Sequence, residues 1–143
     1  MKRIVRPAIL ALCALTTTLL ALPQKHPPVA SGVQETAAKK LHSMLGHNGK
    51  VLAIDVRTPA EYAGGHVPEA VNIPINELPQ KLRQMQVSKD TTIVTLCDHG
   101  GRSSRAALEL RKMGYKATSF CRIDAWQKDG YKITKGDTKP RSE

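Results

Sequence analysis

The chain has few aromatic side chains: its 143 residues include one Trp, three Tyr and one Phe. A sandwich or barrel built on aromatic packing is therefore a poor fit. No stretch reaches the roughly 20 uninterrupted apolar residues of a membrane-spanning helix. Its three cysteines are too few for a scaffold held by many disulfides. Since 41% of the residues are hydrophobic and 24% are charged, we expect one globular domain.

Acidic residues are also scarce, because 12 Asp and Glu stand against 22 Lys and Arg, which gives a net charge of +10. Such a surplus usually indicates nucleic acid, an anionic membrane surface or an anionic substrate as a partner. The bases are scattered, however, and the longest run contains only two residues, as at Lys39-Lys40. There is no basic stripe with interleaved aromatic residues. We therefore expect no nucleic-acid partner, and a positive potential that attracts small anions.

The first 24 residues have the layout of a secretory signal peptide. A positive region with Lys2, Arg3 and Arg6 precedes an apolar core of 15 residues, 8–22. Ala21 and Ala30 are the candidates for the last residue removed. An uncleaved N-terminal anchor is the alternative, although 15 apolar residues are short for a membrane helix. We expect export, signal cleavage and no stable membrane insertion afterwards.

Cleavage removes Cys13 and leaves two cysteines, Cys97 and Cys121. An exported protein meets an oxidising compartment, so this pair requires an explanation as a disulfide or as chemistry.

Strands and helices alternate in the exported part. Residues 25–33 contain Pro and Gly and are expected to form a linker, and residues 136–143 a loose polar tail. Short apolar runs predict strands at 51–54, 70–73, 91–96 and 117–120. Periodicity predicts helices at 34–45, 75–85, 103–113 and 123–126. A further short helix is predicted to begin after Thr58, which can form a capping box with Glu61. This alternation indicates an α/β domain over residues 34–135 with a small, mainly parallel sheet.

One polar loop joins the clearest strand to the clearest helix, and it consists of Cys97, Asp98, His99, Gly100, Gly101, Arg102 and Ser103. Ligands of parallel sheets bind beyond the carboxyl ends of the strands, where this loop begins. Gly100 and Gly101 allow the backbone to turn successive N–H groups inward around an anion. The positive end of the helix dipole and the charge of Arg102 act on the same place. The loop thus predicts a stabilised thiolate and a nucleophilic Cys97. A buried structural cysteine beside a flexible turn is the alternative.

Several ordered motifs resemble those of the rhodanese family. They are Asp55-Val56-Arg57-Thr58-Pro59-Ala60-Glu61-Tyr62, Gly65-His66-Val67-Pro68, Ala70-Val71-Asn72-Ile73-Pro74, the loop Cys97-x-x-Gly100-x-Arg102-Ser103, Leu110-x-x-x-Gly114-Tyr115 and Ala125-Trp126. The resemblance covers residues 33–133. It implies a rhodanese-like α/β fold, a small parallel sheet with helices on both faces. With a signal peptide in front, the chain is similar to the single-domain periplasmic rhodaneses of bacteria.

The resemblance implies a sulfurtransferase. Cys97 would attack the outer sulfur of a small anionic donor such as thiosulfate, release sulfite and keep the sulfur as a persulfide. Cyanide or a thiol, a thioredoxin-like protein among them, would then accept it. Inward N–H groups and Arg102 suit an anionic intermediate. No cofactor and no metal are expected, because neither the histidines nor the cysteines have metal-ligand spacing.

Loop length and cysteine spacing rank the competing functions. Related phosphatases use Cys-x5-Arg, whereas Arg102 stands five positions after Cys97, in a smaller ring that favours sulfur chemistry. A low-turnover sulfur carrier or protein-binding module is the main alternative, because one fold hosts many functions. A thiol–disulfide oxidant using Cys97 and Cys121 ranks last, since it lacks C-x-x-C spacing.

Supporting residues are expected around the loop. Asp55 and Arg57 are expected to pair and brace it. His66 is expected to hold its turn by local hydrogen bonds rather than to act in catalysis. Asp98 and His99 are expected to tune the sulfur, to contact the substrate, or simply to lie exposed to solvent.

Cys121 departs from the family pattern, because related rhodaneses usually carry Gly-Gly where this chain has Cys121-Arg122. Its strand should lie beside the strand that ends at Cys97. We hypothesise that Cys121 is close enough to receive sulfur or to form a disulfide, which requires Cα atoms within about 7 Å. A resolving thiol, a silencing disulfide and a buried bystander remain as alternatives. Arg122 is a candidate for a second anion contact.

Overall fold

The computed structural model describes residues 26–46 and 51–136. The predicted signal peptide, residues 1–24, lies outside them, as does the predicted tail from residue 137 onward. Within the described part, no helix is long and apolar enough to cross a membrane. The elements follow in the order α1 (Ala38–Leu45), β1 (Val51–Asp55), α2 (Pro59–Gly64), β2 (Val71–Asn72), α3 (Leu78–Gln84), β3 (Thr92–Cys97), α4 (Gly101–Lys112), β4 (Ala117–Arg122) and α5 (Ile123–Lys128).

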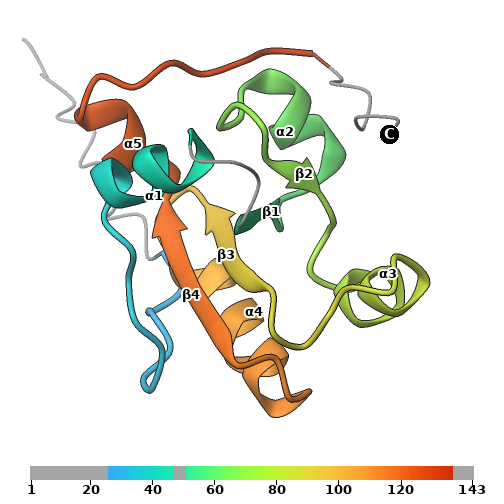
Figure 1. Cartoon of the computed structure of the whole chain (residues 1–143). Coiled ribbons are helices and arrows are strands. Elements are labelled where there is room, and N and C mark those ends of the chain that lie inside the picture. Colours follow the sequence, from blue (N-terminus) through green and yellow to red (C-terminus); the bar gives the residue numbers. More distant parts are fainter. Residues whose placement is uncertain (1–25, 47–50, 137–143) are drawn as a thin grey trace, which may run out of the picture.

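The strands form one sheet of four, in the order β2-β1-β3-β4 (Figure 1). Each neighbouring pair is parallel. In β3 every residue after Thr92 is buried, which explains its nearly continuous apolar run. Because all strands run the same way, their carboxyl ends meet at one edge of the sheet.

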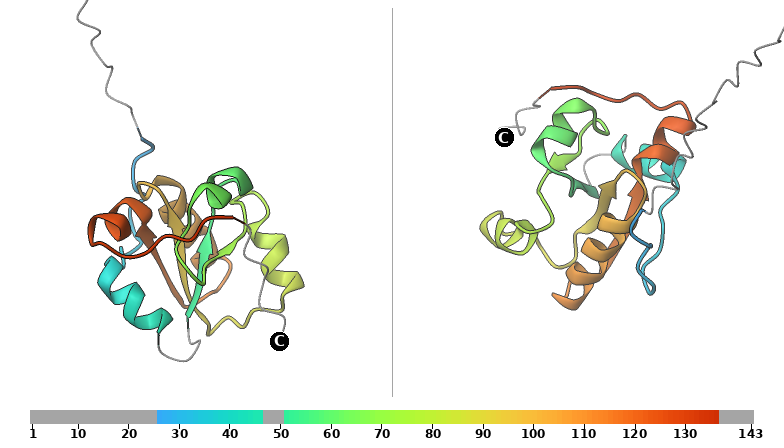
Figure 2. Two further views of the ribbon diagram at one scale, coloured as in Figure 1. Left: turned by 90° about the horizontal axis from the view of Figure 1, so that it is seen from above. Right: turned by 180° about the vertical axis from the view of Figure 1, so that it is seen from behind.

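Helices cover both faces of the sheet (Figure 2). On one face, α1 and α5 contribute Leu41 and Trp126 to a buried core that also contains Val94 and Leu96. On the other face, the core contains residues of α3 and α4 together with Ile54 and Ile93. The predicted α/β class, a small parallel sheet with helices on both faces, is confirmed.

The predicted helix at 34–45 is wrong at its start, because α1 begins only at Ala38. The preceding residues run along β4: the Phe120 N–H donates to the Gln34 carbonyl at 3.1 Å, and the Thr36 N–H donates to the Phe120 carbonyl at 2.7 Å. An edge strand offers unpaired backbone groups, and satisfying them overrides the helical periodicity of this segment.

The other differences lie at element ends. The predicted helix at 75–85 is α3, which starts at Leu78 and places Pro79 in its first turn. A proline there loses no helical hydrogen bond, so Pro79 starts this helix rather than weakening it. The strand predicted at 117–120 continues to Arg122, and α5 follows it directly.

Candidate active site

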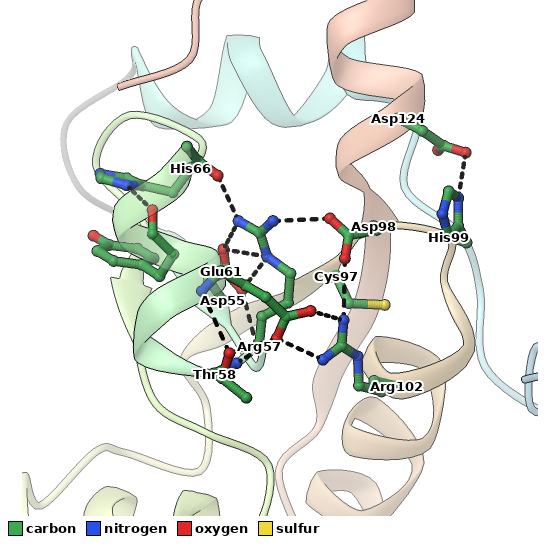
Figure 3. A network of polar contacts seen from close by, with 12 residues as sticks. Asp55, Arg57, Thr58, Glu61, His66, Cys97, Asp98, His99, Arg102 and Asp124 are labelled. Carbon is green, nitrogen blue, oxygen red and sulfur yellow. Dashed lines mark hydrogen bonds and ion pairs between the residues drawn. The ribbon is translucent and has the colours of Figure 1, made fainter. Parts of the chain in front are cut away.

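The site lies where β1, β3 and β4 end. Arg57, Asp98 and Ile123 follow these strand ends directly or within two residues. Figure 3 shows the polar side chains that gather there, with Cys97 as the last residue of β3. The parallel sheet therefore brings Asp55 and Arg57, at the end of β1, next to the loop 97–103 that follows β3, although about 40 positions separate them in the sequence.

Cys97 is buried, with 2% of its surface exposed, and its sulfur faces the start of α4. The backbone N–H of Ser103 donates to Sγ at 3.3 Å, and the Ser103 hydroxyl lies 3.2 Å from Sγ. Gly100 precedes the helix with φ of 88°, a left-handed conformation that favours glycine. The thiol thus lies at the positive end of a helix of 12 residues, which stabilises negative charge on sulfur.

Asp55, Arg57 and Asp98 form a chain of ion pairs that ties β1 to the loop (Figure 3). Asp55 is fully buried, and its Oδ2 lies 2.7 Å from Nη2 of Arg57. Nη1 of the same guanidinium donates to Asp98 Oδ1 at 2.8 Å. The expected Asp55–Arg57 pair is present, and Arg57 extends it to Asp98, the residue next to Cys97. Asp98 is therefore held by arginine while 35% of its side chain stays exposed to solvent.

Arg102 is held by two carboxylates. Its Nη1 and Nη2 donate to the two oxygens of Glu61 at 2.9 and 2.7 Å, and Nη2 also donates to Asp98 Oδ2 at 3.0 Å. The hydrogen bonds from Arg102 lower the pKa of Glu61 from 4.5 to about 2. The sequence predicts that Arg102 offers its charge to an anion, whereas the structure gives that charge two acidic partners.

Glu61 is the site residue that sequence reasoning missed. Its predicted capping box with Thr58 is present, with the Thr58 N–H donating to Oε2 at 2.9 Å. The capping box explains why Glu61 stands in the first turn of α2. Nothing in the local pattern indicates that the same carboxylate reaches Arg102, 41 positions away.

His66 holds its turn, as expected. It is fully buried, and its Nδ1 lies 2.8 Å from the Tyr62 carbonyl, so Nδ1 carries the donated proton. Its ring stacks on Tyr62 with centroids 3.7 Å apart, and its backbone N–H donates to the Thr134 carbonyl at 2.9 Å. These contacts connect α2 to the C-terminal segment and leave the ring turned toward Tyr62 rather than Cys97 (Figure 3).

His99 points away from the network, toward α5. Its Nδ1 lies 3.1 Å from Asp124 Oδ2, and 43% of its side chain is exposed. The ring of His26 packs on it with centroids 3.7 Å apart. The structure thus places His99 outside the chain of ion pairs that contains Asp98.

The predicted linker packs onto the active-site loop. The Ala30 N–H donates to the Ser104 hydroxyl at 2.8 Å. A Cβ on Gly101 would collide with the Pro27 carbonyl, and a Cβ on Gly100 would lie 3.2 Å from Val29. The glycine pair therefore lets residues 26–30 approach the loop closely, which is a second physical reason for glycine at these positions.

Cys121 lies on the opposite face of the sheet from Cys97. The register pairs Cys121 with Leu96 and Cys97 with Arg122, and successive residues of a strand point to opposite faces. Cys121 belongs to the core under α1 and α5, whereas Cys97 belongs to the core under α3 and α4. Both thiols are free, and burial raises the pKa of Cys121 to about 12. This geometry contradicts the disulfide and relay hypotheses and fits the buried-bystander alternative.

Arg122, the candidate for a second anion contact, stands opposite Cys97 in the strand register and pairs with two acids. Its Nε donates to Glu35 Oε1 at 2.8 Å, and its Nη1 lies 3.7 Å from Asp124 Oδ2. The guanidinium therefore links the edge segment to β4.

A cavity of about 540 Å³ opens beside the loop, and it is lined by Arg57, Glu61, Gly64, Gly65, Asp98, Ile123, Gln127, Ile133 and Lys135. Two ion-pair carboxylates, apolar walls and one lysine thus face a shared space at the carboxyl ends of the strands.

Among residues 26–46 and 51–136, no group of three or more His, Cys, Asp or Glu side chains is arranged to hold a metal ion.

Comparisons with known proteins agree with this architecture. The family described as Rhodanese-like domain matches residues 37–128. A protein named sulfurtransferase from Allochromatium vinosum is 35% identical over 103 residues, which cover 71% of this chain and 94% of that protein. A solved structure described as rhodanese with anions from E. coli is 30% identical, with a TM-score of 0.53, over 60% of this chain and 99% of that one.

A thiosulfate sulfurtransferase from Pseudomonas aeruginosa shares the fold. It has a TM-score of 0.66 at 20% identity, and the match covers 73% of this chain and 20% of that one.

Proposed function

The chain belongs to the rhodanese family, and we propose that it transfers sulfane sulfur through a persulfide on Cys97. A sulfur-transfer role in general follows from the family and from the relative named sulfurtransferase. The observation that carries the proposal is the position of the Cys97 sulfur, 3.3 Å from the Ser103 N–H at the start of α4. An N–H donor and a helix dipole at this position stabilise the negative charge of an attacking sulfur and of the persulfide that follows.

The transfer divides into two displacements. The Cys97 thiolate attacks the outer sulfur of the donor, the donor's S–S bond breaks, and its electron pair leaves with the rest of the donor. With thiosulfate the leaving group is sulfite, and the new bond is a persulfide on Cys97. An acceptor, cyanide or a thiolate, then attacks the outer sulfur and returns the Cys97 thiolate. The N–H and hydroxyl of Ser103 and the α4 dipole stabilise the negative charge that resides on sulfur throughout.

Intact mass tests the proposal. Reduced protein is weighed before and after thiosulfate, with Cys97→Ala and Cys121→Ala as variants. The expected result is a gain of one sulfur in wild type and Cys121→Ala, reversed by cyanide, and no gain in Cys97→Ala. Absence of the gain in reduced wild type, with thiosulfate and with an organic persulfide alike, contradicts the persulfide proposal.

A low-turnover sulfur carrier that serves one thiol protein, such as a thioredoxin-like partner, is the second candidate. The deep burial of Cys97, 2% exposed, favours it, because a buried sulfur resists rapid exchange with small molecules. Turnover separates the two functions. An enzyme releases many equivalents of thiocyanate from thiosulfate and cyanide, whereas a carrier stops near one equivalent.

The basic residues Lys2, Arg3 and Arg6 and the apolar segment 8–22 that follows them support a periplasmic location, which export of a tagged full-length chain tests.

A further inference from the structure

We propose that Glu61 makes this site select sulfur donors of low negative charge, such as monoanionic organic persulfides, over dianionic thiosulfate. The inference rests on the proposed function and names the class of donor. Glu61 acts by neutralising Arg102, the one arginine of the active-site loop. It is thus a specificity-determining residue that acts through another side chain.

The charges around the loop and its cavity balance. On the cavity side, the acids Asp55, Glu61 and Asp98 face the bases Arg57, Arg102 and Lys135, which lies on the cavity wall. On the other side of the loop, two bases stand against two acids: Arg105, which donates to the Gly101 carbonyl, and Arg122, against Glu35 and Asp124. Once Cys97 is a thiolate, the sum is negative. An approaching dianion is therefore repelled where the reaction occurs. The net charge of +10 is spread over the whole chain, and its more distant parts are screened beyond about 10 Å at 0.1 M salt.

Hydrogen bonds on both oxygens fix the Glu61 carboxylate beside Arg102. Both of its oxygens accept hydrogen bonds from Arg102, and Oε2 also accepts the N–H and the hydroxyl of Thr58. With a pKa of about 2, it stays a carboxylate at every pH at which the enzyme could work. A donor anion that competes for Arg102 must first displace these contacts.

The cavity beside the loop, whose lining includes Asp98 but not Cys97, offers room for the organic part of a donor. At about 540 Å³ it falls in the size range of sites for small organic molecules, and a small oxyanion such as thiosulfate would leave most of it empty. Ile123 and Ile133 supply apolar wall, and Gln127 and Lys135 supply polar groups for a single negative charge. Volume and charge therefore point to the same class, a small organic persulfide.

The step is a thiol–persulfide exchange. The Cys97 thiolate attacks the outer sulfur of the monoanion R–S–S⁻, the donor S–S bond breaks, and R–S⁻ departs with its electron pair. The outer sulfur keeps its negative charge and becomes Cys97–S–S⁻, so that atoms and charge balance and no oxidant or reductant is needed.

Alkylation of Cys97 measures the local charge without depending on sulfur transfer. The rates for anionic iodoacetate and neutral iodoacetamide are determined at one pH, and their ratio cancels the thiolate fraction. In Glu61→Gln we expect the iodoacetate-to-iodoacetamide ratio to rise by about tenfold, because one negative charge near the thiolate is removed. Glu61→Asp, which keeps the charge, should retain the wild-type ratio.

The matched control is Glu109→Gln. Glu109 lies on α4, as does Arg102, but it is exposed and paired with Lys112. This variant changes the net charge equally and should leave the ratio as in wild type. An unchanged ratio in Glu61→Gln, or an equal rise in Glu109→Gln, overturns the proposal. If Glu61 only held the loop in place, Glu61→Gln would slow both reagents together.

Sulfur donors complete the test. We expect wild type to have a higher kcat/KM with a monoanionic alkyl persulfide than with thiosulfate, and Glu61→Gln to narrow that preference by about tenfold. A wild-type preference for thiosulfate contradicts the inference. If neither donor loads Cys97, the proposed function fails, while the alkylation ratio still decides whether Glu61 sets the charge selectivity.

Discussion

Cys97 and Cys121 belong to hydrogen-bonded neighbouring strands, yet their side chains lie on opposite faces of the sheet. Strand order alone brings the two residues together, and it prompted the hypothesis of a sulfur relay. Side-chain alternation separates them, because Cys121 stands opposite Leu96 rather than Cys97. A register shift of one residue is enough to turn a relay partner into a core residue.

The thiol-labelling prediction follows from this separation. The pKa of Cys121 is about 12, whereas Cys97 lies at the positive end of α4, so of these two thiols iodoacetamide at pH 8 is expected to modify only Cys97 in the native protein. Both thiols should react after denaturation, also in protein exposed to oxygen beforehand. Peptide mapping by mass spectrometry assigns the labels. Recovery of a Cys97–Cys121 disulfide from native protein contradicts the structure.

The second prediction concerns the buried Asp55–Arg57 pair. Arg57→Met leaves the Asp55 carboxylate buried without its guanidinium partner, a change that typically costs about 3–5 kcal/mol of unfolding free energy. Urea unfolding followed by the fluorescence of Trp126, the single tryptophan, measures the loss. The double variant Asp55→Asn with Arg57→Met removes the stranded charge and should recover part of the stability. A double variant less stable than Arg57→Met contradicts this account.

Much of the fold was predictable because local signals agreed with the tertiary structure. The Thr58 and Glu61 capping box starts α2 as predicted, and the β-branched run ending at Leu96 forms the central strand β3. Gln34 and Thr36 show why the rest was not predictable. Their helical pattern yields to the open edge of β4, a partner more than 80 residues away.

The active site also has a part that the sequence predicts and a part that it does not. Cys97 and its glycine loop stand out because their chemistry is local in sequence. The link from Glu61 to Arg102 and the packing of Pro27 on Gly101 join residues far apart in the chain, and no periodicity or spacing encodes them. The balance of charge at the site therefore became visible only in the structure.

The third prediction tests the turn beside the thiol. Gly100 has φ of 88° and Gly114 has φ of 90°, so alanine is strained at both, by about 1–2 kcal/mol. A Cβ at Gly114 meets nothing within 4 Å, whereas one at Gly100 would lie 3.1 Å from Phe120 and 3.2 Å from Arg122. Gly100→Ala should therefore lose more stability in urea unfolding than the matched control Gly114→Ala.

Sulfur loading extends the comparison of the two glycine variants. Because Gly100 shapes the loop that follows Cys97, its variant should also load sulfur more slowly, while Gly114→Ala keeps the wild-type rate at equal folded concentration. Intact-mass time courses with an excess of donor give both rates. Equal rates for the two variants contradict a role for the Gly100 turn in positioning the thiol.

The last prediction is a pH dependence of stability. Hydrogen bonds from Arg102 lower the folded-state pKa of Glu61 from 4.5 to about 2, so its carboxylate stabilises the folded state. That contribution is fully present above about pH 4.5 and is lost as the pH falls toward 2. Wild type should thus lose unfolding free energy over this window, and Glu61→Gln should lose less, so that the gap between them closes with acid. Arg102→Met removes the partner and should flatten the same part of the profile. Urea unfolding at each pH measures the unfolding free energy of the three proteins. If the difference between wild type and Glu61→Gln stays constant from neutral pH to pH 2, the result contradicts the ionised Glu61–Arg102 pair.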